Sequence, residues 1–165
     1  MNVVGLDLSL THTGVADGFT GPWVIDPKKL RGIERVDFIA NLILINMDER
    51  TDLICIEGYS FGSRSSQAHA LGELGGVVRR DLWREGFTYI DVPPSTLKTY
   101  ATGKGNAGKV DVIVAARDRL GYEGTDDNEA DASWLRALGL DLLGEPLVSL
   151  PQTHRRALDK MEVPG

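Results

Sequence analysis

Short apolar runs and amphipathic segments alternate along the 165-residue chain, and their order restricts the possible folds more than any other feature. Apolar runs of period two predict strands, and apolar residues spaced by three and four predict helices. Strands are predicted within residues 2–9, 15–19, 22–25, 52–58 and 87–92, and helices at 30–47, 66–85, from Ser95, 109–121 and 128–140. This order predicts an α/β fold with a five-stranded mixed sheet flanked by helices, because hairpins join the first three strands as antiparallel neighbours and helical crossovers add two parallel ones.

The length of the chain favours one domain with a sizeable core. Residues 1–143 contain all the predicted elements without a repeat or a linker, so we expect them to form a single domain. Residues 144–165 show no clear pattern, and we expect a C-terminal tail that is partly disordered.

The composition is that of an ordinary globular protein, with 42% hydrophobic and 25% charged residues. The sequence has no apolar run of about 18 residues that predicts a transmembrane helix, and its first residues do not resemble a signal peptide. The single cysteine, Cys55, excludes an internal disulfide and a cysteine-based zinc site. We therefore expect a cytoplasmic protein, in a bacterium or a phage-infected host, without membrane association.

The net charge of −6 mildly disfavours a nucleic-acid partner, but the charges are unevenly distributed. Between Gly62 and Tyr122, nine basic residues stand against six acidic ones. Acidic residues concentrate elsewhere, for example in EGTDDNEAD at 123–131. An acidic spot within a locally basic frame is compatible with a metal-dependent site that acts on a polyanion.

Three acidic residues occupy positions where a lone carboxylate is unfavourable. Asp7 interrupts the apolar run of the first strand, Glu57 ends the run of the fourth, and Asp131 lies near the start of the last helix. Burying one carboxylate costs several kcal/mol unless something compensates it. Taken singly, each acid has a simpler interpretation, as a turn or ion-pair residue, a strand-end acid or a helix-capping acid.

Carboxylates that converge need protons or divalent cations to balance their charge. Mg²⁺ prefers carboxylate, water and phosphate oxygens, and two such ions about 4 Å apart serve phosphodiester hydrolysis. His12 and His69 lack the spacing of zinc ligands, and no serine nucleophile is evident. Together the three acids favour a metal-dependent phosphodiester hydrolase over the separate interpretations.

Over roughly residues 2–140, the sequence resembles the RuvC family of Holliday junction resolvases, within the ribonuclease H-like superfamily. The similar stretches are VVGLDLSLTHTG, DLICIEGYSFG, PPSTLKTYATGKGNAGKVDV and DNEADASWLRALGL. They match the family's first catalytic Asp, its strand-ending Glu, its basic segment and its closing helix. The short chain and the segment TGKGNAGK resemble phage-encoded members of the family.

The resemblance implies a ribonuclease H-like fold and a Mg²⁺-dependent endonuclease. Such an enzyme resolves Holliday junctions and other branched DNA and leaves 5′-phosphate and 3′-hydroxyl ends. The implied catalytic acids hold two Mg²⁺ ions, for which Mn²⁺ can substitute, and they are Asp7, Glu57, Asp127 and Asp131. Lys109 is the candidate for contact with the scissile phosphate, although a solvated lysine at a helix start is the alternative interpretation.

The fourth metal ligand departs from the family's pattern. The family has Asp or His three residues before the last Asp, where this sequence has Asn128. We prefer Asp127 as the fourth acid, because residues four apart share a helix face and Asp127 can stand beside Asp131. Asn128 stays open as a neutral metal ligand.

The same segments supply candidate DNA contacts. Three residues after Glu57, where the family often has an aromatic that wedges into the junction, this chain has Ser60, flanked by Tyr59 and Phe61. Either ring could wedge into an unstacked step, and a core position is the alternative for both. Contacts to backbone phosphates are expected from Lys109 and from three further basic residues, Arg64, Lys98 and Lys104.

The assembly follows from the substrate and the family. A four-way junction has two-fold symmetry and needs paired cuts, so we expect a C₂ homodimer with helix 66–85 at the interface. Close helix approach through Gly72, Gly75 and Gly76 is one interpretation of that segment, and packing against the sheet is the other. A branch-migration motor is not expected as a partner.

Rival functions share parts of this pattern. A RuvX-like nuclease of the ribonuclease H fold, which acts on structured RNA, shares the early Asp and the strand-end Glu but not the basic segment at 95–110. An ATP-binding fold of the actin and sugar-kinase type also begins with a strand, an Asp and a polar turn, but it needs two such domains. A binding module without catalysis is disfavoured by the presence of all three acids.

Overall fold

The structure is a computed structural model that describes residues 1–59 and 66–164. Its five strands are β1 (Val3–Asp7), β2 (Thr13–Ala16), β3 (Pro22–Ile25), β4 (Leu53–Glu57) and β5 (Tyr89–Val92). They form one sheet in the order β3-β2-β1-β4-β5. The first three strands pair antiparallel, and β4 and β5 add in parallel, so the predicted mixed sheet is confirmed.

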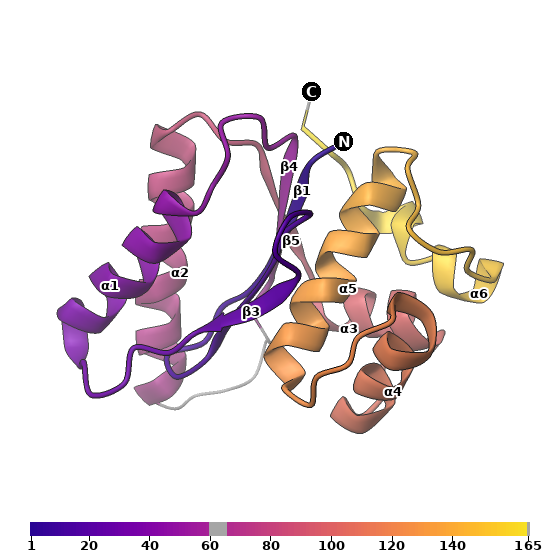
Figure 1. The fold of residues 1–165 in the computed structure, drawn as a ribbon, viewed down its shortest axis with the longest axis horizontal. Coiled ribbons are helices and arrows are strands. Elements are labelled where there is room, and N and C mark those ends of the chain that lie inside the picture. The colour runs from indigo at the N-terminus through magenta and orange to yellow at the C-terminus, as the bar shows by residue number, and fades with distance from the viewer. Residues whose placement is uncertain (60–65, 165) are drawn as a thin grey trace.

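Helices cover both faces of the sheet (Figure 1). Two lie on one face, α1 (Gly32–Ile45) and α2 (Ser66–Arg84). The others lie on the opposite face: α3 (Pro94–Thr102), α4 (Lys109–Leu120), α5 (Asp127–Leu142) and α6 (Gln152–Arg155). The α/β class is therefore confirmed, and the predicted element order is confirmed through α5, after which the structure adds α6.

Side chains alternate along β1 and pack into two separate cores, one on each face of the sheet. Val4 and Leu6 are buried with the apolar residues of α1 and α2. Val3 is buried on the other side, among the apolar residues of α3, α4 and α5. Cys55 of β4 belongs to this second core and is fully buried, as its apolar surroundings in the sequence predict.

Two helix ends show how local sequence sets the element boundaries. Helix α3 begins at Pro94, with Pro93 as its N-cap, one residue before the predicted start near Ser95. Proline suits a first turn because its φ is already helical and its missing N–H has no partner there. Helix α4 ends at Gly121, whose φ of 69° is the left-handed conformation that glycine adopts readily.

Residues after Gly144 pack onto the second core. They form α6 and a short 3₁₀ helix, Leu158–Lys160, and bury Leu150 and Ala157. Arg155 of α6 donates to Asp141 of α5, whose carboxylate also accepts the Tyr100 hydroxyl at 3.1 Å. Local periodicity shows no sign of this packing, because the buried positions are few and widely spaced. Among the described residues, no helix is long and apolar enough to cross a membrane.

Candidate active site

Asp7 and Glu57 end neighbouring parallel strands and lie on the same face of the sheet. The β1–β4 register pairs Leu6 with Ile56, so the next residues, Asp7 and Glu57, stand side by side. Their parity directs both side chains toward the face covered by α5. Asp7 is only 7% exposed, and its carboxyl is close enough to that of Glu57 for the two to interact. Two acids in contact need a proton or a cation between them.

Helix α5 brings the third acid to this pair by close approach to the sheet. A Cβ on Gly5 of β1 would overlap the carbonyl oxygen of Ala132, and one on Gly14 of β2 would overlap that of Asn128. Both glycines are therefore needed for α5 to rest on the two strands. Asp131 lies between these contact points on α5. The role of Gly14 in β2 is thus to admit the helix that carries Asp131.

The pKa values of all three carboxyls are raised, and burial is the largest cause for each. The pKa of Asp7 is raised well above its usual value by burial and then by the charges of Glu57 and Asp131. Burial, followed by Glu57 and Asp127, raises the pKa of Asp131 to about 7. Burial also raises the pKa of Glu57. The neighbouring Asp7 carboxyl and the charges of nearby lysines lower that pKa. Ionising all three carboxyls in this site is therefore energetically unfavourable.

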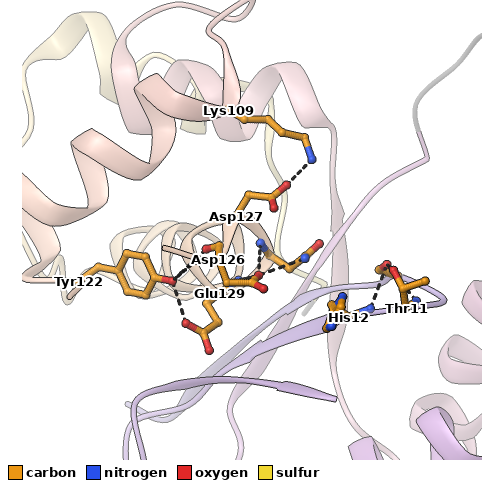
Figure 2. Close-up of polar contacts among 9 residues, drawn as sticks. Thr11, His12, Lys109, Tyr122, Asp126, Asp127 and Glu129 are labelled. Carbon is orange, nitrogen blue, oxygen red and sulfur yellow. Dashed lines mark hydrogen bonds and ion pairs between the residues drawn. The ribbon is translucent and has the colours of Figure 1, made fainter. Parts of the chain in front are cut away.

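Two lysines face this acidic cluster. Lys109, the first residue of α4, forms an ion pair with Asp127 at the start of α5 (Figure 2). Lys98 of α3 acts with Lys109 to lower the pKa values of Glu57 and Asp131. Helix α4 is held on α5 by the indole N–H of Trp134, which donates to the Val112 carbonyl at 3.2 Å. Lys109 therefore reaches the site from a fixed helix.

The residues just before Asp127 cap helix α5. Asp126 is the N-cap and accepts the backbone N–H groups of Asn128 and Glu129. The amide of Asn128 donates to the same Asp126 oxygen at 3.1 Å. Asp126 thus has the capping role that acids favour at this dipole end.

The Tyr122 hydroxyl contacts Asp126 and the carboxylate of Glu129, and so secures the same turn (Figure 2). Sequence spacing predicts neither this role of Tyr122 nor its contact with Glu129.

Of the remaining predicted DNA contacts, the structure describes Lys104 and Tyr59. Lys104 is exposed in the loop between α3 and α4. Tyr59 follows β4 and is 43% exposed, with its hydroxyl directed at α2. Phe61 and Arg64 lie outside the described residues. His12 and His69 are both exposed, and His12 lies in the turn between β1 and β2 (Figure 2).

The donor chemistry fits a divalent oxygen-seeking cation, since the nearby acids otherwise repel one another. Carboxylates from β1, β4 and α5 supply only oxygen donors, as Mg²⁺ prefers. Within residues 1–59 and 66–164, no three His, Cys, Asp or Glu side chains are grouped so that they could hold a metal ion without rearrangement. Asp127 is paired with Lys109, so binding an ion through Asp127 would require this contact to be exchanged for a metal contact.

Comparison with known proteins gives two kinds of similarity. No family model matches the sequence. The crossover junction endodeoxyribonuclease RuvC of Synechococcus sp. (strain CC9311) is 30% identical over 109 residues, which are 65% of this chain and 68% of that protein. Among solved structures, Thermus thermophilus RuvC matches with a TM-score of 0.69 at 23% identity, over 88% of this chain and 98% of that one. T. thermophilus RuvC in complex with a Holliday junction substrate matches equally well, at 21% identity and over 97% of that chain.

Proposed function

Because this chain belongs to the RuvC family of crossover junction endodeoxyribonucleases, we propose that it is a Mg²⁺-dependent, structure-selective nuclease. Its substrates are Holliday junctions and other branched DNA. It hydrolyses phosphodiesters to leave 5′-phosphate and 3′-hydroxyl ends. A phage-encoded origin and a cytoplasmic location are part of the same proposal.

The observation that carries the proposal is the meeting of Asp7, Glu57 and Asp131 at the carboxyl ends of two strands and the start of a helix. Their pKa values are all raised by burial and, for Asp7 and Asp131, also by the charges of neighbouring acids that include Glu57. A structural role would not require three acids from three distant segments in one place. Groups with strongly perturbed pKa values that cluster in this way are candidates for function.

Two bound Mg²⁺ ions would supply an activated water and stabilise the leaving oxygen of the phosphodiester. We propose that Asp7 would contact both ions, since the charges of Glu57 and Asp131 both act on it. Glu57 and Asp131 flank it and would each complete one side of the site. We propose Asp127 as the fourth acid, because its charge acts on both Asp7 and Asp131. Asn128 is the alternative, and its amide is already used by Asp126.

Lys109 is proposed to contact the scissile phosphate. Its ammonium group is held at the site by Asp127, and its side chain is 77% exposed, so it is accessible to DNA. If Asp127 held an ion, the ammonium group of Lys109 would be free to contact a phosphate oxygen. A cation at this point would offset the charge that develops during cleavage.

DNA binding is proposed to extend from this site. Lys98 and Lys104, with Arg64, would contact backbone phosphates, which position DNA without reading its sequence. Tyr59 and Phe61 are the two candidates for the ring that unstacks the branch point. A C₂ homodimer would place two sites at a fixed separation for paired cuts, without a branch-migration motor.

The test is cleavage of synthetic four-way junctions in Mg²⁺. We expect nicks in symmetric pairs. Asp7→Asn should abolish cutting while junction binding in a gel-shift assay persists, and the exposed Asp118→Asn should behave as the wild type. Equal activity on plain duplex, or on structured RNA, would contradict the junction assignment.

A further inference from the structure

Arg79 on α2 joins three parts of the molecule close to Glu57. Its Nε–H donates to Asp91 of β5 at 2.9 Å, and Nη1 donates to the Tyr59 hydroxyl at 3.2 Å and to the Gly75 carbonyl at 3.0 Å. Its guanidinium carbon lies 4.8 Å from the centroid of the Tyr59 ring, within cation–π range. Only 13% of the Arg79 side chain is exposed, whereas the Asp91 side chain is 51% exposed, so a buried guanidinium joins partners that themselves reach the surface.

Gly75 supplies the space in which Tyr59 sits. A Cβ at position 75 would overlap the Tyr59 hydroxyl and would lie 2.6 Å from Nη1 of Arg79. A Cβ on the next residue, Gly76, would meet open space. The Tyr59 hydroxyl also lies 3.4 Å from the Gly72 carbonyl oxygen. Tyr59 is therefore anchored on α2 through its hydroxyl and its ring face. We call these contacts with Gly72, Gly75 and Arg79 the Tyr59 seat.

This seat is next to the candidate metal ligand on β4. Tyr59 follows Glu57 by two residues, and the intervening Gly58 donates its N–H to the Val92 carbonyl at 2.8 Å, which extends the contact between β4 and β5. A cavity of about 70 Å³ is lined by Glu57, Tyr59 and Arg79 together. The chain is thus held on both sides of Gly58, and Glu57 is at the start of the held segment.

We propose that Tyr59, Arg79 and Gly75 are positioning residues that hold the end of β4, so that Glu57 is oriented for metal binding. Tyr59 is then an anchor on α2, and it does not stack on a base at the branch point. The inference rests on the proposed function in treating Glu57 as a metal ligand. Groups that orient a ligand in this way commonly change metal affinity by about 10–100-fold when they are removed.

The test is a Mn²⁺ titration followed by thermal stabilisation of the protein, which reports metal binding independently of cleavage. We expect Arg79→Met and Gly75→Ala each to raise the half-saturating Mn²⁺ concentration by about 10-fold. The half-saturating Mn²⁺ concentration of the double variant should be no higher than that of the single variants, because both changes remove the same contacts of Tyr59. Arg80→Met is the matched control, since Arg80 is the neighbouring arginine and pairs with the adjacent Asp81.

Tyr59→Phe keeps the test decisive if the other variants fold poorly, because it removes one hydroxyl and retains the ring. We expect it to raise the half-saturating Mn²⁺ concentration by about threefold, since one hydrogen bond to a charged group is lost. The fluorescence of 2-aminopurine at the branch point of a bound junction should not change. An unaltered Mn²⁺ response in both Tyr59→Phe and Arg79→Met overturns the proposal, as does a loss of 2-aminopurine unstacking in Tyr59→Leu with a normal Mn²⁺ response.

The two proposals fail in different ways. A wild-type protein that binds Mn²⁺ but does not cut four-way junctions contradicts the nuclease function. The Mn²⁺ titrations of the variants then still decide whether the Tyr59 seat orients Glu57.

Discussion

Removing the charge of Asp131 should make the metal-free protein more stable. The pKa of Asp131 is raised from 3.8 to about 7 by burial and by the charges of Glu57 and Asp127. In the unfolded chain this carboxyl ionises near its ordinary pKa, so the folded state loses stability as pH rises from about 4 to about 7. A difference of about three units corresponds to roughly 4 kcal/mol at pH 8, an upper value because the neighbouring acids share protons.

Asp131→Asn is the variant that measures this cost. We expect urea unfolding in EDTA at pH 8 to show it more stable than the wild type by about 2–4 kcal/mol. At pH 4 the difference should nearly vanish, because the wild-type carboxyl is then neutral in the folded protein. Asp118→Asn, a change at an exposed acid of α4, controls for net charge and should stay within about 0.5 kcal/mol at both pH values.

Mg²⁺ should remove most of this stability difference between the two proteins. A ligand at about 100 times its dissociation constant stabilises a protein by about 2.7 kcal/mol. The wild type should gain stability of this order, and Asp131→Asn should gain much less because it lacks a ligand carboxylate. If Asp131→Asn is less stable than the wild type in EDTA at pH 8, the acid is a stabilising ion-pair or capping residue, and the reasoning is refuted.

Three further predictions follow from particular contacts. Gly14→Ala should push the start of α5 off the sheet, lower the unfolding free energy by about 1–3 kcal/mol and slow single-turnover junction cleavage, whereas wild-type rates would contradict the close approach of Asn128. Under saturating Mg²⁺, Asp127→Ala should lower the cleavage rate more than Asn128→Ala does, and the opposite order would assign the fourth ligand to Asn128. Arg155→Met should destabilise the protein by about 1–3 kcal/mol in urea, because it leaves the fully buried Asp141 carboxylate without its cation; no loss would show that the tail contributes little to the core.

Much of the architecture could be predicted from local patterns. The order of strands and helices follows from apolar spacing, since the periods of two and of 3.6 residues are properties of the backbone itself. The alternation along β1 and β4 also assigns Asp7 and Glu57 to one face once the strands are paired. The family resemblance, carried by the stretches around Asp7, Glu57 and Asp131, agrees with the fold and with the curated relative.

Other features depend on contacts between distant segments. The pairing of Tyr59 with Arg79 joins residues 20 positions apart, and the ion pair of Lys109 with Asp127 joins two helices. The packing of residues 144–164 likewise has no periodic signal, because a few buried side chains such as Leu150 suffice to hold it.

The order of the elements can be predicted from the sequence, as can the presence of acids where apolar residues are expected. That α5 meets the sheet at Gly5 and Gly14 is evident only in the folded chain. Local periodicity is a property of the backbone, whereas the distance between a strand and a helix depends on side chains that meet only when both are packed. The absence of a Cβ at Gly5 and Gly14 has no meaning until Ala132 and Asn128 lie against them.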